Sequence, residues 1–475
     1  MIKNNTDILI YSCPSFKQSR VNNKISNNFK KIYKNNWIIN FSKNKKVFVV
    51  TYGCQANYRD SEKVVGIFLY AGFKLTDSEK DADIVFVNTC AVREKAEKKV
   101  FSYLERLKNK IIIFSGCMAM EEKIVKKIID KKMSINIVIS INNIGKIFFL
   151  LKQHIITKKN IVDVNSNFFN VNDERLPNNF NFSNFKAFVN VNYGCDKLCT
   201  YCIVPYTRGP EIDRNFKDII DECRKLADLN YQEIVLIGQN VSSYGIKHDT
   251  TFAKLLDEVA KLKIPRIYFL TCHPYDFSLD IIRIMKKHKN ILPYLHLPIQ
   301  SGDDNILKLM GRKYNSQYYL KLVDNIRKIF PDIVLSTDII IGFPTETDKE
   351  FKNTLKIVQQ IKFDNIFMFI FSKRHGTPAY NMVDNVSDAV KKNRFQILDS
   401  WYMKIIEEKN KKYLNNIYDV LVDGISKKNK NTLEGRLITN KIVHFFGKKS
   451  MIGKIIKVKI TETHPFFLFG EVFSK

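Results

Sequence analysis

The chain lacks any long hydrophobic segment: no apolar run in its 475 residues approaches the ~18 residues that a membrane-spanning helix needs. Acidic residues are scarce as well, because 48 Asp and Glu stand against 77 Lys and Arg, which gives a formal net charge of +29. The nine cysteines show no regular pairing, and this favours a reducing compartment over a disulfide scaffold. We therefore expect a cytoplasmic protein that is not inserted in a membrane.

The excess of positive charge has two explanations. A strongly basic protein attracts polyanions such as nucleic acids. A chain that is rich in Lys, Asn and Ile throughout, with many more Lys than Arg, also becomes basic through the base composition of its genome. The net charge supports a polyanionic partner without establishing one.

The first 45 residues are rich in Asn and Lys and nearly free of acidic residues. An organelle transit peptide is one interpretation of this composition. The segment contains a single arginine, Arg20, and shows no amphipathic Arg/Ser pattern. We therefore expect residues 1–45 to form a disordered basic extension.

Three closely spaced cysteines, Cys195, Cys199 and Cys202, follow a short apolar run at residues 187–193. The spacing C-x3-C-x2-C lets three thiolates ligate three corners of a four-iron cluster and leaves one iron open. An open metal position can chelate a small ligand. The alternatives are a zinc knuckle and buried thiols that pack as small apolar groups. No His or fourth Cys follows at zinc-finger spacing, so the pattern favours an iron–sulfur site.

This triplet, with the aromatic Tyr201 before its last cysteine, resembles the signature of the radical S-adenosylmethionine (SAM) family. In that family the open iron holds the amino and carboxylate groups of SAM. One electron from the cluster then cleaves SAM and yields a 5′-deoxyadenosyl radical. The resemblance therefore implies a [4Fe-4S] cluster and SAM as cofactors.

From residue 46 the sequence alternates between short apolar runs and helical patterns. Strands are expected at residues 47–50, 84–87 and 111–114, and helices at about 60–70, 94–107 and 121–129. This alternation is typical of an α/β domain with a doubly wound parallel sheet. We expect this domain to occupy residues 46–151 and a linker to occupy residues 152–184.

A second set of thiols follows these strands. Cys54, Cys90 and Cys117 each lie a few residues beyond the carboxyl end of one strand. In a parallel sheet those ends share one edge, where such folds bind ligands. Three thiols at one edge favour a second iron–sulfur site; coincidental buried thiols are the alternative.

The sequences around this second set narrow the resemblance. Residues 51–57 (TYGCQAN), 88–96 (NTCAVREKA) and 116–119 (GCMA) resemble the amino-terminal domain of the radical SAM methylthiotransferases. In that family the three matching cysteines hold an auxiliary four-iron cluster involved in sulfur transfer. The resemblance extends from about residue 46 to the end of the chain and implies two [4Fe-4S] clusters.

Residues 185–400 read as six parallel strands with helical crossovers, a pattern that suggests a partial (βα)6 barrel open to a large substrate. Groups that act in such barrels lie just past the carboxyl ends of the strands. Gly permits close approach there, and Gln and Asn supply amide donors and acceptors, although each such residue is also common in ordinary turns. We expect the SAM pocket to include Tyr201, Gln239, Asn240, Gln300, Ser301 and Gly342.

Two arginines follow the cysteine loop. Arg208 stands in a segment that resembles the R-G-x-E motif of the family, and Arg208 or Arg214 can offer a guanidinium to the carboxylate of SAM or to an RNA phosphate. An ion pair with Glu211 is the alternative. Asp213 stands where relatives usually carry Ser, so Arg214 is not counted as a site residue. Four other side chains are expected to be structural: His273, His296, Cys223 and Cys272.

Residues 413–475 alternate at period two between turns, which suggests a small antiparallel β-barrel of OB-like character. This region resembles the TRAM domain, an RNA-binding barrel of these enzymes. A basic barrel suits a phosphate backbone, although part of the charge only keeps the surface solvated. The basic residues are Lys427, Lys428, Lys430, Arg436, Lys441, Lys448, Lys449, Lys454, Lys457 and Lys459.

Two segments, Val92–Glu94 and Gly238–Gly245, resemble one branch of the methylthiotransferases. That branch converts N6-isopentenyladenosine 37 of tRNA to its 2-methylthio derivative, so the anticodon loop of tRNA is the expected partner. Sibling branches of the family modify a ribosomal-protein aspartate or threonylcarbamoyl-adenosine in tRNA. The alternative that is not an enzyme is an iron–sulfur redox sensor that binds RNA. We expect a monomer that also depends on an electron donor and a sulfur source.

Overall fold

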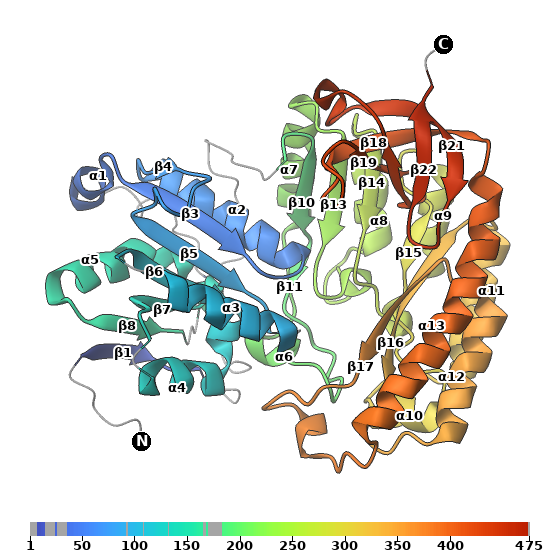
Figure 1. Cartoon of the computed structure of the whole chain (residues 1–475), viewed down its shortest axis with the longest axis horizontal. Coiled ribbons are helices and arrows are strands. Elements are labelled where there is room, and N and C mark those ends of the chain that lie inside the picture. Colours follow the sequence, from blue (N-terminus) through green and yellow to red (C-terminus); the bar gives the residue numbers. More distant parts are fainter. Residues whose placement is uncertain are drawn as a thin grey trace. The chain divides into compact units, whose positions relative to one another are not determined.

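The computed structural model describes residues 7–14, 24–25, 36–91, 94–107, 109–131, 133–164, 168–169 and 183–473. These residues form two compact units. The first unit holds the residues up to 182 together with 190–215 and 374–380, and the second holds 183–189, 216–373 and 381–475. Figure 1 shows the elements of both. No helix in the described ranges is long and apolar enough to cross a bilayer.

The first unit is built on a seven-stranded sheet with the order β1-β8-β7-β6-β5-β3-β4. Every neighbouring pair of strands runs parallel. The predicted parallel sheet is therefore confirmed. Its strands are β1 (Ile8–Ser12), β3 (Lys46–Thr51), β4 (Lys74–Leu75), β5 (Ile84–Thr89), β6 (Ile111–Gly116), β7 (Ile137–Ile139) and β8 (Asn160–Asp163).

Helices cover both faces of this sheet (Figure 1). Ile84 and Phe86 of β5 pack into a core with α1 (Asn36–Ser42), α2 (Gln55–Tyr70) and α5 (Ile147–Thr157). Val85 and Val87 face the opposite core, which contains α3 (Glu94–Arg106) and α4 (Glu122–Asp130). Because successive side chains of a strand point to opposite faces, a strand that is buried along its whole length, such as β5, needs a helical layer on each side.

Three segments of the first 45 residues, β1, β2 (Lys24–Ile25) and α1, form regular secondary structure, so the expected disorder is wrong for them. β1 pairs in parallel with β8, and the Ser12 hydroxyl donates to Asp163 at 2.6 Å. α1 buries Ile38 completely. The expected linker at 152–184 is also wrong for the end of α5 and for β8, which belong to the first unit. The short strand β2 pairs with β9 (Phe168–Phe169).

The second unit contains the six predicted barrel strands in two three-stranded sheets. Within the first of these sheets β13 runs parallel to β14, and in the second β16 runs parallel to both of its neighbours. A parallel bridge between Ile267 and Ile291 links β14 to the segment before β15. The strands are β10 (Lys186–Asn190), β13 (Glu233–Ile237), β14 (Arg266–Phe269), β15 (Tyr294–His296), β16 (Val334–Ile341) and β17 (Asn365–Ile370).

Helices follow these strands as the crossover pattern predicts. Their apolar faces contribute buried residues such as Leu255, Ile281 and Val358, so the strands are buried against a helical layer. The helices are α7 (Phe216–Asp228), α8 (Phe252–Ala260), α9 (Leu279–Lys287), α10 (Asp304–Leu309), α11 (Ser316–Ile329), α12 (Asp348–Ile361) and α13 (Asp388–Asn410).

The chain ends in a closed five-stranded barrel with the order β18-β19-β20-β22-β21. Two features differ from the expectation: β22 was not predicted, and it pairs with β20 in parallel. Val443, Phe445 and Val458 fill the core. The strands are β18 (Ile417–Ile425), β19 (Leu433–Leu437), β20 (Ile442–Phe445), β21 (Ile455–Thr463) and β22 (Leu468–Val472).

Candidate functional site

Cys54, Cys90 and Cys117 follow the carboxyl ends of three neighbouring strands. Across these strands Thr51 pairs with Asn88, and Thr89 pairs with Gly116, so β3, β5 and β6 end in register. The strand order also reverses at β3, which lies between β4 and β5. Such a reversal creates the crevice in which open α/β sheets bind their ligands.

A buried amide holds the loops after β3 and β5 together. The Asn57 Nδ2 group donates to the Asn88 side chain at 3.1 Å and to the Thr89 carbonyl at 3.0 Å. Its Oδ1 atom accepts from the Cys54 backbone N–H at 3.3 Å. Asn57 therefore sets the position of Cys54 relative to the strand that precedes Cys90.

The surroundings of Cys54 favour the thiolate form of its side chain. Cys54 is the N-cap residue of α2, and the positive end of a helix favours a thiolate. A hydrogen bond from Cys90 lowers the pKa of Cys54 to about 5, with further help from the positive charge of Arg208 and from two backbone N–H groups of α2. Cys90 and Cys117 are buried, and burial raises the pKa of the Cys117 thiol, although Arg208 opposes this shift.

Arg208 reaches this thiol group from the segment that follows the C-x3-C-x2-C loop. Its guanidinium donates to Cys117 Sγ at 3.3 Å and to Asp60 Oδ2 at 2.8 Å. The whole residue is 8% exposed. Arg208 is thus committed inside the first unit and does not present its guanidinium to an RNA phosphate.

The loop with Cys195, Cys199 and Cys202 is held by backbone contacts. The Cys195 N–H donates to the Gly209 carbonyl, and the Cys202 N–H donates to the Cys199 carbonyl, both at 3.0 Å. Gly194 has φ +65, and a Cβ atom there would lie 2.0 Å from the Pro210 carbonyl oxygen. The turn into the loop therefore requires glycine.

Both cysteine triplets belong to the first compact unit. Within the described ranges, no group of three or more His, Cys, Asp or Glu side chains is arranged to hold a single metal ion. A four-iron cluster is larger than one ion and takes thiolates at separate corners. Sulfur is its usual ligand, so two sets of three thiols are donors of the right chemistry for such clusters.

The SAM-pocket candidates follow strand ends, but several are already engaged. Tyr201 is half-buried in the first unit, whereas the other five lie in the second. The Asn240 side chain donates to Asp276 at 2.7 Å and accepts from Ser242 at 2.6 Å. Ser301 is buried beside Thr354. Structural hydrogen bonds thus account for the side chains of Asn240 and Ser301.

Gln239, Gln300 and Gly342 lie in turns after β13, β15 and β16. Gln239 is half-buried. Gln300 has φ +73. Its backbone N–H donates to the Asp338 carbonyl of β16, and its carbonyl accepts from the Ile340 N–H of the same strand, both at 2.9 Å. Gly342 has φ +68, and a Cβ atom there would lie 2.3 Å from Cγ of Lys391. The sequence identified these turns correctly, and they stay candidates for SAM contacts.

A buried pair beside Gly342 was not predicted. Glu346 accepts from the Gly342 N–H at 3.0 Å and from Arg394 at 2.9 Å. Burial raises the pKa of Glu346 to about 7. The pair joins the turn after β16 to α13, and the only signal in the sequence was a Glu four residues after Gly342.

The expected structural histidines form hydrogen bonds. His273 Nδ1 accepts from the Tyr275 N–H at 3.3 Å, and His296 Nδ1 lies 2.7 Å from the Ser336 hydroxyl. Cys223 and Cys272 are buried. Val92 and Arg93, which carried part of the family resemblance, lie outside the described residues.

Eight lysines of the carboxyl-terminal barrel are exposed, whereas Arg436 and Lys441 are not. Arg436 is buried, and burial lowers the pKa of Lys441 to about 8. Phe446 is 60% exposed and follows β20. Lys448 and Lys449 follow it after Gly447, and such a combination of aromatic and basic side chains is typical of single-strand nucleic-acid binding.

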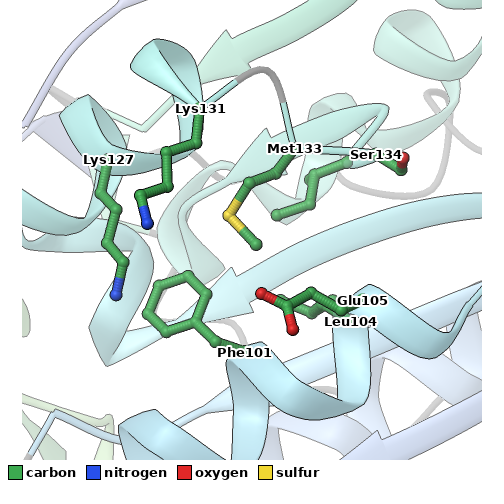
Figure 2. Close-up of a pocket in the computed structure, with 8 residues that line it drawn as sticks. Phe101, Leu104, Glu105, Lys127, Lys131, Met133 and Ser134 are labelled. Carbon is green, nitrogen blue, oxygen red and sulfur yellow. The ribbon is translucent and has the colours of Figure 1, made fainter.

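A pocket of about 360 Å³ lies between α3 and α4 in the first unit (Figure 2). Phe101 and Met133 form part of its wall, and the Lys127 ammonium lies 3.8 Å from the centre of the Phe101 ring. In a parallel sheet the helix carboxyl ends lie toward the amino-terminal ends of the strands. The pocket is therefore not at the edge that carries the cysteines.

Three family models match this chain. Residues 189–358 match the radical SAM superfamily, residues 46–140 match the uncharacterized protein family UPF0004, and residues 411–473 match the TRAM domain. The predicted radical SAM and TRAM domains are thereby confirmed.

A solved structure shares the fold. The radical S-adenosylmethionine methyltransferase TsrM from Kitasatospora setae, with cobalamin and a [4Fe-4S] cluster bound, aligns with a TM-score of 0.50 at 12% identity. The alignment covers 71% of this chain and 74% of that one.

Two curated relatives are much closer in sequence. A tRNA-2-methylthio-N(6)-dimethylallyladenosine synthase from Bacillus cytotoxicus is 46% identical over 443 residues, and its counterpart from Bacillus cereus is 45% identical over the same length. Each alignment covers 91% of this chain and 87% of the relative. The chain therefore belongs to the tRNA-2-methylthio-N(6)-dimethylallyladenosine synthase family of radical SAM enzymes.

Proposed function

We propose that this enzyme converts N6-isopentenyladenosine 37 of tRNA to its 2-methylthio derivative. The observation that carries the proposal is the presence, in one compact unit, of a C-x3-C-x2-C loop and a second cysteine triplet at the edge of a parallel sheet. The reaction requires radical chemistry, because C2–H of adenine is neither acidic nor electrophilic enough for ordinary acid–base catalysis. The names of the relatives support the choice of substrate.

Each cysteine triplet has a separate role in this proposal. Cys195, Cys199 and Cys202 would hold a [4Fe-4S] cluster whose open iron binds SAM and supplies the electron for its cleavage. Cys54, Cys90 and Cys117 would hold the auxiliary cluster, at which sulfur is delivered. The low pKa of Cys54 supports this second role, because thiolates rather than thiols ligate iron.

Turns of the second unit would contribute to SAM binding. Gln239 and Gln300 can offer amide groups, and Gly342 would let the turn after β16 keep its positive φ beside the pocket. Tyr201, Asn240 and Ser301 would support these contacts, with Asn240 and Ser301 acting through the hydrogen bonds that fix their loops.

The carboxyl-terminal barrel would bind the tRNA. Exposed Lys448 and Lys449 can neutralise phosphates, and Phe446 can stack on an unpaired base. An anticodon loop is single-stranded, so its bases can leave the stack at modest cost. Because the substrate is tRNA, we place the enzyme in the cytoplasm, where it also requires an electron donor and a source of sulfur.

The proposal is tested with purified, reconstituted enzyme, SAM, a reductant and sulfide. Transfer RNA that carries the isopentenyl group should be methylthiolated, whereas tRNA without that group should not. One SAM would supply the methyl group and a second the radical, so S-adenosylhomocysteine, methionine and 5′-deoxyadenosine should all accumulate. Labelling of a ribosomal protein instead, with no change in either RNA, would assign the chain to the protein-modifying branch.

A further inference from the structure

Arg208 connects the two cysteine triplets within the first unit. Its Nε group donates to Cys117 Sγ at 3.3 Å. The next residue, Gly209, accepts the backbone N–H of Cys195 at 3.0 Å. Two consecutive residues thus contact one proposed ligand from each triplet.

The position of the guanidinium is fixed from two sides. Arg208 follows α6 (Val204–Thr207), and its backbone N–H donates to the Val204 carbonyl at 2.8 Å. At the far end of the side chain, Nη2 donates to Asp60 Oδ2 of α2 at 2.8 Å. Ile203 and Tyr206 pack with Ala91 and Cys117 in one apolar cluster. These contacts hold the Nε–H group so that it points toward the Cys117 sulfur.

A buried guanidinium is costly unless it is paired, and replacing both members of a buried ion pair by apolar side chains is often no worse for stability. Folding alone therefore gives no strong reason for an arginine at this place. An N–H group that donates to a ligand sulfur withdraws electron density from it, and a positive charge nearby favours the form of a cluster that carries one more electron. Both effects raise the reduction potential of a cluster held by that sulfur.

We propose that Arg208, oriented by Asp60, is a positioning residue that fixes the Cys117 sulfur and raises the reduction potential of the auxiliary cluster. This inference rests on the proposed function, because it assumes that Cys54, Cys90 and Cys117 hold a cluster. Through Arg208 and Gly209, one continuous segment, residues 195–209, carries the SAM-binding triplet and also contacts a ligand of the auxiliary cluster.

The experiment isolates the auxiliary cluster. The full chain with Cys195, Cys199 and Cys202 replaced by Ala is reconstituted anaerobically, and its one-electron midpoint potential is measured by redox titration with electron paramagnetic resonance. The variants R208Q and R208Q/D60N are measured in the same background. The double variant leaves no unpaired carboxylate at the site, so it provides the comparison if R208Q alone folds poorly.

Arg214 provides the matched control. It is also a buried arginine of the first unit, and its guanidinium donates to the Asn190 carbonyl at 2.7 Å. We expect R208Q and R208Q/D60N to shift the midpoint to a more negative potential and R208K, which keeps the charge, to shift it less. R214Q should leave the midpoint unchanged.

The outcomes separate the inference from the proposed function. If the background protein binds no iron, the auxiliary site itself is wrong. If it binds a cluster whose midpoint is the same with R208Q/D60N as with Arg208 and Asp60 in place, the tuning role is overturned. An equal shift in R214Q would also overturn it, since the effect would then follow from any loss of buried positive charge.

Discussion

Arg436 of the carboxyl-terminal barrel donates to Glu233, the first residue of β13, at 2.7 and 3.2 Å. Glu233 is fully buried, and Arg266 and Lys186 also pair with it, at 3.1 and 3.3 Å. Arg436 makes two further bonds to Asp423, each 2.7 Å long. Within the second unit, the barrel is therefore attached to the amino-terminal ends of the radical SAM strands by a buried charge network.

The first prediction concerns this attachment. Replacing Arg436 with Met should lower the free energy of unfolding by about 3–5 kcal/mol, because a buried carboxylate loses its main partner. The control is Lys457→Met in the same barrel, where an exposed lysine pairs with Asp419 at 3.2 Å; that loss should be below about 1 kcal/mol. Denaturant midpoints provide the measurement, and equal midpoints for the two variants would contradict a structural role for the network.

The second prediction concerns the pH dependence of stability. Burial alone would raise the pKa of Glu233, but the charges of Arg436, Lys186 and Arg266 outweigh it and lower the pKa to about 2. An unfolded Glu has a pKa of about 4.3, so the unfolded chain binds more protons between these values. The stabilising contribution is complete above about pH 5 and is lost as the pH falls toward 2.

The measurement for this prediction is the difference in unfolding free energy between the natural protein and Glu233→Gln across a pH series. The difference should shrink by about 3 kcal/mol as the pH falls through that window. A constant difference would mean that the Glu233 carboxylate has the same pKa in the folded and unfolded chains.

The third prediction concerns RNA binding. Replacing Lys448 and Lys449 with Ala should weaken tRNA binding and reduce the magnitude of its salt slope by about 2, because each lysine would release one phosphate counterion. Phe446→Ala should cost about 1–3 kcal/mol of binding with an unchanged slope, since stacking is not ionic. Lys457→Ala is the control. Salt slopes identical to that of the natural protein for all variants would show that Lys448 and Lys449 contact no phosphate and that the positive charge here reflects only the amino-acid composition of the chain.

The fourth prediction concerns the turn before Cys117. Gly116 has φ +94, and a Cβ atom would lie 2.2 Å from the Thr89 carbonyl oxygen. Gly116→Ala should cost at least about 1–3 kcal/mol through its backbone conformation and should reduce iron binding by the Cys54, Cys90 and Cys117 set. Gly424→Ala meets no atom within 4 Å and should change stability by less than about 0.5 kcal/mol. Iron content and thermal midpoints decide between these outcomes.

The sequence was sufficient where a local rule determines position. Cys54, Cys90 and Cys117 could be placed at one edge because each follows an apolar strand, and parallel strands align their ends. The same rule placed Gln239, Gln300 and Gly342 at turns, but it could not show which of their neighbours form hydrogen bonds. Spacing identified the C-x3-C-x2-C loop without any knowledge of the fold.

Contacts between residues far apart in the chain could not be predicted from the sequence. The bond from Arg208 to Asp60 joins residues 148 positions apart, and that from Arg436 to Glu233 joins residues 203 positions apart. Periodicity indicates which face of a strand or helix is buried. It does not indicate which buried charges will pair, so Arg436 was taken for a surface residue. β1 was missed for the same reason, because it lies in an Asn-rich segment and becomes a strand by pairing with β8.

The most direct test of the proposed function is nucleoside analysis of tRNA from cells that lack their own 2-methylthiolating enzyme and express this chain. Mass spectrometry should detect 2-methylthio-N6-isopentenyladenosine with the natural sequence and only N6-isopentenyladenosine when Cys195, Cys199 and Cys202, or Cys54, Cys90 and Cys117, are replaced by Ala. Persistence of unmodified N6-isopentenyladenosine with the natural, iron-loaded protein would contradict the proposed function.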